Sequence, residues 1–167
     1  MRSVGISKGD LLVATPLIKS MPWRKSVIFI TEASSSSVMG TILNRSTLMT
    51  AQDITDVAVP NTQVYMGGPI STQALFMLHT SDFRSSNTLD VTDSWAVSSD
   101  TFMFDKLANS EQPAWYRFYM GASAWHPSQL AQELAGDNWM IIHRPSFSLV
   151  TEDSNTQWQA CVDHLSQ

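Results

Sequence analysis

The sequence predicts an α+β fold. Segments with the apolar pattern of strands outnumber helix-like segments by about two to one, and the two kinds do not alternate regularly along the chain. No repeat or linker divides the 167 residues, and the one low-complexity stretch is a short serine run. We therefore expect residues 1–167 to form a single α+β domain, long enough to bury roughly 70% of the surface that its unfolded chain exposes.

The strand candidates are short runs rich in apolar, β-branched and aromatic residues, each bounded by turn-forming residues. Residues 11–16 form a continuous apolar run, which is typical of a strand that is buried on both faces. Four serines at 34–37 make a hairpin-type connection between the next two candidates. In chain order, the expected strands cover residues 11–16, 26–33, 38–44, 63–66, 74–80, 88–91, 95–97, 114–120 and 138–144.

Two helices are expected between these strands. Thr50 and Asp53 have the spacing of a capping box, which predicts a short helix as far as residue 58. Ser98 or Ser99 is expected to cap a second helix that ends near Ala108.

Two further helices are expected near the C-terminal end of the sequence. Pro127 at a first helical position and Gly136 at the stop define a helix over residues 127–135. The last helix presents an apolar face at helical spacing, formed by Trp158, Cys161, Val162 and Leu165.

The charge balance argues against direct binding of DNA. Ten Lys and Arg residues face fifteen Asp and Glu residues, which gives a net charge of −5. The basic residues are dispersed, and Lys19, Arg24 and Lys25 form their only local group. A DNA-binding surface needs several cations on one face to release counterions from the phosphates.

The chain has the features of a cytoplasmic protein. Its single cysteine, Cys161, cannot form an intrachain disulfide, which favours a reducing compartment. No window reaches the ~18 uninterrupted apolar residues of a membrane-spanning helix. The first apolar run is short and is broken by Pro16, so we expect a strand there rather than a secretory leader.

The ordered motifs resemble those of the AlgH/YqgE family. They read "GDLLVATP", "SVIFITE", "VMGTILNR", "VYMGGPI", "LFMLHT", "YMGASAWHPSQLAQELAGDNWM" and "TQW", and they cover residues 9–162. The resemblance implies a compact fold in which a mixed, bifurcated sheet curls into a pseudo-barrel with flanking helices.

The chain departs from the family pattern at several positions. Thr15 replaces a methionine, Ser46 replaces a proline, and "GASAW" stands where the family has Gly-Tyr-Ala-Gly-Trp. The resemblance implies no settled biochemical activity. Some members carry the label of transcriptional regulators, which the acidic composition does not support as direct DNA binding.

Gly67-Gly68-Pro69 joins two expected strands and raises the question of a ligand-binding loop. The segment lacks the Lys-Ser/Thr of a phosphate loop, and Pro69 removes an N–H group that would face an anion. We interpret it as a tight strand corner in which at least one glycine, Gly68 in preference to Gly67, adopts a positive φ or another conformation that is closed to alanine.

"GASAW" invites comparison with the Gly-x-Ser-x-Gly turn of hydrolases. Trp125 occupies the position of the last glycine, and the next helix begins only near Pro127. A hydrolase that uses Ser123 would need His79, His126 or His143 within hydrogen-bond reach. The spacing of histidines and of the single cysteine predicts no metal site, and no motif predicts a cofactor.

Polar residues follow two of the expected strands and form the candidate binding site. If the strands that end at Asn44-Arg45 and at His79-Thr80 are neighbours, these four side chains line one pocket beside the glycine corner formed by Gly67 and Gly68. Arginine offers a fork for carboxylate or phosphate, while asparagine and histidine offer single hydrogen bonds. In the alternative interpretation, Arg45 and His79 bond only to loop carbonyl groups.

The sequence therefore predicts a binding or regulatory module without a catalytic motif, whose partner is a small anionic ligand or another protein. Two other classes stay open. One is a small hydrolase that uses Ser123 with a histidine, and the other is a structural protein-interaction domain with an exposed apolar patch. The pattern specifies no oligomeric state.

Overall fold

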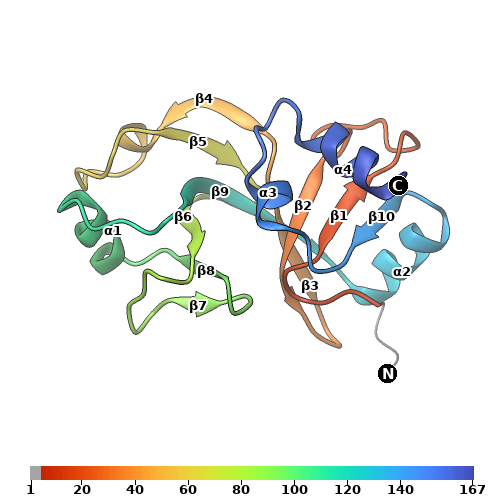
Figure 1. The fold of residues 1–167 in the computed structure, drawn as a ribbon, viewed down its shortest axis with the longest axis horizontal. Coiled ribbons are helices and arrows are strands. Elements are labelled where there is room, and N and C mark those ends of the chain that lie inside the picture. The colour runs from red at the N-terminus through yellow and green to blue at the C-terminus, as the bar shows by residue number, and fades with distance from the viewer. Residues whose placement is uncertain (1–4) are drawn as a thin grey trace.

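The computed structural model describes residues 5–167, which form one curled, mixed sheet with helices on its outside (Figure 1). The strands are β1 (Leu11–Ala14), β2 (Val27–Ala33), β3 (Val38–Ile42), β4 (Ser46–Thr50), β5 (Gln63–Met66), β6 (Ile70–Thr80), β7 (Leu89–Asp90), β8 (Trp95–Ser98), β9 (Tyr116–Trp125) and β10 (Trp139–Ile142). The helices are α1 (Thr101–Ala108), α2 (Pro127–Ala135), α3 (Phe147–Thr151) and α4 (Gln157–Leu165), with a short 3₁₀ turn η1 (Ala51–Asp53). The expected α+β class with a bifurcated, curled sheet is confirmed.

The sheet forks at β9, the long strand that crosses the middle of the molecule in Figure 1. The strand order is β10-β1-β2-β3-β9-β6-β8-β7, and β5 pairs with β9 while β4 pairs only with β5. Phe118–Met120 of β9 pair with β6 on one edge and, in parallel, with β5 on the other. Ser123–Trp125 then pair with β3. The same edge of β9 therefore pairs with β5 along its first part and with β3 along its last part, and the sheet forks between these two strands.

The core lies on both faces of the sheet. Leu11 and Val13 of β1 join one apolar cluster, while Leu12 and Ala14 join another on the opposite face. The side chains of α4 complete the first cluster, and Leu130 of α2 completes the second. Because successive strand side chains point to opposite faces, β1 is buried on both sides, as its continuous apolar run predicts.

A third cluster forms under α1, where Met103, Phe104 and Leu107 pack against Phe118 of β9. Each such side chain contributes about 1.5–3 kcal/mol when it is fully removed from water. No helix among residues 5–167 is long and apolar enough to cross a membrane.

Several expected boundaries need correction. The helix expected from Thr50 to residue 58 is only the turn η1, although its capping box is present and Thr50 N donates to Asp53 Oδ2 at 2.8 Å. The chain turns back because the side-chain amide of Gln52 donates to the carbonyls of Val57 and Val59, both at 3.0 Å. These side-chain bonds hold the segment after Asp53 in a loop instead of a further helical turn.

Further differences occur near α1 and β9. The N-cap of α1 is Asp100 rather than Ser98 or Ser99. The strand expected over residues 114–120 continues to Trp125, so "GASAW" is extended strand and not a strand-to-helix turn. β4 and α3 were not expected from the sequence.

Candidate functional site

The six residues expected to form one pocket do not come together. Arg45 lies near the glycine segment, since Met66 N donates to the Arg45 carbonyl at 2.8 Å, but His79 and Thr80 lie far from both. The strand order shows the reason, because β9 lies between β3 and β6 and the two strand ends are not neighbours. His79 pairs with Tyr116 of β9, whereas Gly68 lies against Ala122. These two positions on β9 are separated by about 20 Å at ~3.3 Å per residue. The hypothesis of a single pocket beside the glycine corner is therefore wrong.

Gly67 and Gly68 lie where the chain crosses over β9. β5 and β6 pair with opposite edges of β9, so the three residues that connect them must pass across its face. Gly68 has φ +149°, and a Cβ there would overlap the backbone of Ala122. Gly121 beneath it has φ +80°, and a Cβ there would overlap the carbonyl of Gly68. The expectation of a corner with Gly68 at positive φ is confirmed, and its cause is the close approach of two backbones.

Ser123 belongs to the same crossing. Its side chain is completely buried, and its Oγ donates to the carbonyl of Gly67 at 3.1 Å. No histidine is among its hydrogen-bond partners in the described part of the chain, where His126 contacts Ser128 and His143 contacts Asp10. The hydroxyl holds the crossing segment on the sheet and lacks the base that a hydrolase would need.

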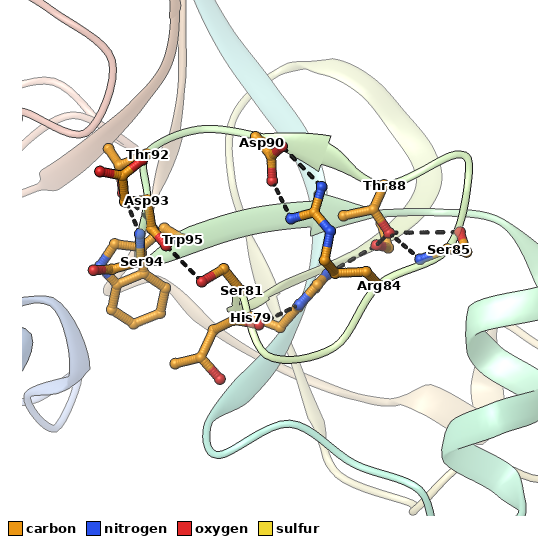
Figure 2. Close-up of polar contacts among 12 residues, drawn as sticks. His79, Ser81, Arg84, Ser85, Thr88, Asp90, Thr92, Asp93, Ser94 and Trp95 are labelled. Atoms are coloured by element: carbon orange, nitrogen blue, oxygen red, sulfur yellow. Dashed lines mark hydrogen bonds and ion pairs between the residues drawn. The ribbon is translucent and has the colours of Figure 1, made fainter.

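His79 and Thr80 stabilise the end of β6. The ring of His79 is completely buried, with Nδ1 2.8 Å from the Thr80 carbonyl and Nε2 2.8 Å from Ser98 Oγ (Figure 2). Because a carbonyl can only accept, Nδ1 carries the proton and Nε2 accepts from the Ser98 hydroxyl. Burial lowers the pKa of His79, and the hydrogen bond to Thr80 offsets this only partly. This geometry matches the alternative in which His79 bonds to a loop carbonyl.

Asn44 and Arg45 line a cavity of about 600 Å³ between the end of β3 and the beginning of α4. We call it the Lys25–Arg45 pocket. Its walls come from the loop after β1, from the residues between β3 and β4, and from the beginning of α4. The lining residues are Met21, Lys25, Asn44, Arg45, Ser46, Ser154, Asn155, Trp158 and Gln159. Two of them are cationic and none is acidic, so the charges that line the pocket are positive.

Asn44 fixes the wall that carries Lys25. Its Oδ1 accepts from Val27 N at 3.0 Å, and its Nδ2 donates to the Lys25 carbonyl at 2.9 Å. The amide therefore holds Lys25 in a turn with φ 56°. Such a conformation costs an ordinary residue roughly 1–2 kcal/mol, which the two hydrogen bonds offset.

Arg45 is held rigidly at the back of the pocket. Its Nε donates to the Pro22 carbonyl at 2.9 Å, and its Nη2 donates to the Arg24 carbonyl. Burial, and then the charge of Arg24, lower the pKa of Arg45. A guanidinium has so high an ordinary pKa that it keeps its charge in proteins. Arg45 thus satisfies loop carbonyls and also leaves a fixed positive charge beside the cavity.

Trp158 and the start of α4 form the opposite wall. The Lys25 ammonium lies 5.3 Å from the centroid of the Trp158 ring, and the indole N–H donates to the Ala14 carbonyl at 2.8 Å. The N-cap of α4 is Thr156, whose side chain does not cap the helix and instead donates to Glu152 at 2.7 Å. The first N–H groups of α4 therefore lack a side-chain cap from Thr156.

Sequence reasoning found Asn44 and Arg45 but missed Lys25, Asn155 and Trp158 as their neighbours. Lys25 was visible as part of the only local basic group, and Trp158 as part of the last apolar face. No group of three or more metal-ligating side chains occurs among residues 5–167.

Comparison with known proteins gives the family. The AlgH-like family model (DUF179) matches residues 11–167. UPF0301 proteins of Francisella philomiragia and Francisella tularensis subsp. novicida are 29% and 27% identical over 170 residues, covering 94% of this chain and 88% of each relative.

Two solved structures have the same fold. The AlgH protein from Pseudomonas aeruginosa has a TM-score of 0.81 at 20% identity, covering 99% of this chain and 90% of that one. A protein from Corynebacterium diphtheriae has a TM-score of 0.77 at 22% identity, covering 97% and 88%. With a family match over nearly its whole length, this chain belongs to the AlgH-like family.

Proposed function

We propose that this protein is a cytoplasmic binding module that holds a small anionic ligand, bearing a carboxylate or a phosphate, in the Lys25–Arg45 pocket. The observation that carries the proposal is a cavity of about 600 Å³ lined by two cations and by no acidic side chain. Its size lies within the range of about 300–1,000 Å³ that is usual for small-molecule sites.

The two cations would act differently. Arg45 is held by backbone carbonyls and supplies a fixed charge, whereas Lys25 has no ion-pair partner among residues 5–167 and is free to contact a ligand. An anion about 4 Å from the Lys25 ammonium gains roughly 4 kcal/mol of gross Coulomb energy at an effective dielectric constant near 20, and part of this gain offsets desolvation. The half-buried Trp158 lines the same pocket, with the Lys25 ammonium over its ring, and it adds apolar surface beside that cation.

Binding would serve regulation rather than catalysis. Ser123 is sealed under the crossing segment, so it offers no nucleophile to a substrate. The polar side chains that line the Lys25–Arg45 pocket are amides, hydroxyls and cations, with no carboxylate or histidine to act as a general base. A ligand that stabilises this end of the molecule would then change its affinity for a protein partner.

A second candidate function is protein interaction through the β4 edge of the sheet. β4 pairs only with β5, and its Leu48 side chain is 103% exposed. An uncovered edge strand without charged residues is a template for pairing with another chain. If this surface binds a partner, Leu48→Lys will abolish the complex while leaving anion binding in the Lys25–Arg45 pocket unchanged.

Thermal unfolding with a panel of anions tests the proposal. The panel contains inorganic phosphate, sulfate, acetate, citrate and adenosine monophosphate. A ligand at about 100 times its Kd stabilises by ~2.7 kcal/mol, which corresponds to a rise in Tm of roughly 5–10 °C for a chain of this size.

Matched lysine variants locate the site. Lys25→Ala removes the free cation, and Lys19→Ala removes a neighbouring lysine that does not line the pocket. We expect the anion-dependent rise in Tm to disappear in Lys25→Ala and to persist in Lys19→Ala. If no anion raises Tm, or if both variants respond like the wild type, the proposal is wrong.

A further inference from the structure

A second cavity, of about 840 Å³, lies between the segments next to β1 and β10 and the turn between β7 and β8. It shares no residue with the Lys25–Arg45 pocket. We call it the Asp10 cleft. Its walls are the segment before β1, the turn between β7 and β8, and the segment after β10. These contribute residues 7–10, 92–95 and 143–145, and Figure 2 shows the turn with Thr92, Asp93, Ser94 and Trp95.

A buried carboxylate lies at the base of the Asp10 cleft. Asp10 is only 4% exposed, and its Oδ2 accepts from Ser7 N at 2.8 Å and contacts His143 Nδ1 at 2.9 Å. The other oxygen, Oδ1, has no hydrogen-bond partner among residues 5–167. Because Asp10 also lines the cleft, Oδ1 is the atom that can accept a hydrogen bond from a molecule in it.

Two cations line the same cleft. Lys8 and Arg144 have no ion-pair partner in the described part of the chain, where the ion pairs are Arg84–Asp90 and His143–Asp10. Asp93 adds a second carboxylate to the lining. The cleft thus offers both signs of charge at separate positions, in contrast to the purely positive Lys25–Arg45 pocket.

The walls are fixed before a ligand arrives. Gly9 has φ +89°, and a Cβ there would overlap the side chain of Thr92 on the opposite wall. Thr92 Oγ1 in turn accepts from the N–H groups of Ser94 and Trp95, both at 3.2 Å. These contacts fix the backbone of two of the three walls, so a ligand would have to order mainly the exposed side chains of Lys8 and Arg144.

From these observations we propose that the Asp10 cleft binds a small zwitterion, an amino acid or a short peptide, with its ammonium group on Asp10 Oδ1 and its carboxylate on Arg144 and Lys8. A ligand of one sign would satisfy one set of charges and face repulsion from the other. A ligand with both charges can satisfy Asp10 and the two cations together, because charges of both signs line the same cleft. This site is independent of the anion site proposed above.

Titrations followed by amide NMR of the full chain test this inference. The probes are glycine, β-alanine, γ-aminobutyrate and glycylglycine, which increase the distance between the two charges. N-acetylglycine and glycinamide each remove one charge. We expect at least one zwitterion to shift the amide signals of Gly9, Ser94 and Arg144. We also expect that zwitterion to bind at least about tenfold more tightly than N-acetylglycine or glycinamide. That ratio is the one expected for a hydrogen bond to a charged group.

Variants separate the two halves of the proposed contact. Asp10→Asn keeps the shape of the side chain and removes its charge, so it is expected to weaken zwitterion binding by about tenfold or more. Arg144→Gln, at an exposed position, is expected to reduce the preference for a zwitterion over its amide, because only Lys8 then remains for the carboxylate. Lys25→Ala, in the other pocket, is the matched control and is expected to bind zwitterions like the wild type.

The inference is overturned if no zwitterion shifts these amides at about 10 mM, a concentration that detects a Kd near 1 mM. It is equally overturned if the one-charge probes bind as tightly as the zwitterions, or if Arg144→Gln binds like the wild type. Should Asp10→Asn unfold, the probe comparison on the wild type and the Arg144→Gln result still decide.

Discussion

Replacing Gly68 by alanine places a methyl group at the point where the connection between β5 and β6 crosses β9. In the structure, a Cβ at Gly68 would overlap the carbonyl of Ala122 and the hydroxyl of Ser123. The first of these is backbone in a paired strand, which cannot move without breaking the sheet. The substitution also places a side chain at φ +149°, a conformation that L-residues rarely adopt.

The two effects set the magnitude. A strained backbone conformation costs about 1–3 kcal/mol, and overpacking of a tight contact costs about another 1–3 kcal/mol. We therefore expect Gly68→Ala to lower the free energy of unfolding by roughly 2–6 kcal/mol. At a site that tolerates alanine, the same change would raise the free energy of unfolding by ~0.4–1 kcal/mol. A close backbone crossing and a tolerant site therefore predict changes of opposite sign.

Urea denaturation followed by tryptophan fluorescence measures the effect. Gly5→Ala is the matched control, because Gly5 has φ +74° and no atom of residues 5–167 lies within 4 Å of a Cβ placed there, so it reports backbone strain without overlap in the described part of the chain. Gly68→Ala should unfold at clearly lower urea than Gly5→Ala. A midpoint equal to or above that of the wild type would refute the account of a close backbone crossing.

Three further predictions concern the core, pH and DNA. Trp125→Ala and Trp139→Ala should each cost about 3–5 kcal/mol in urea denaturation, because both rings are buried and meet edge to face at 6.1 Å; midpoints equal to that of the wild type would show that the rings are dispensable. Since burial lowers the pKa of His79, the unfolded chain takes up a proton first as pH falls, so stability should be complete above about pH 6.5 and decrease below it. Urea midpoints measured between about pH 7.5 and 5 report this loss of stability. If the midpoint of His79→Gln falls with pH as steeply as that of the wild type, the prediction is contradicted. No specific DNA binding is expected at physiological salt, and fluorescence anisotropy that showed affinity falling steeply with salt would contradict the charge argument.

Elements with complete local signals could be predicted from the sequence. The helix expected between Pro127 and Gly136 has the same bounds in the structure, since proline at its start and glycine at its end act locally. β4 could not be predicted, because it depends on distant pairing such as Ser46 with Tyr65. Neither propensity nor alternation marks its five residues as a strand.

The candidate site could be predicted only in part for the same reason. Asn44 and Arg45 were recognisable as polar residues after a buried strand. Their neighbour Trp158 comes from the last helix, which docks through its hydrogen bond to the Ala14 carbonyl. The insertion of β9 between β3 and β6, which separates His79 from Arg45, is a property of topology that no local pattern carries.

The most direct test of the central proposal is an amide and indole NMR titration of the wild-type protein with inorganic phosphate and with the anion that raises Tm most. The account predicts saturable shifts of the Lys25, Asn155 and Gln159 amides and of the Trp158 indole, with the same shifts lost in Lys25→Ala. Shifts confined to other parts of the chain, or unchanged spectra at an anion concentration that raises Tm, would contradict an anion site between Lys25 and Arg45.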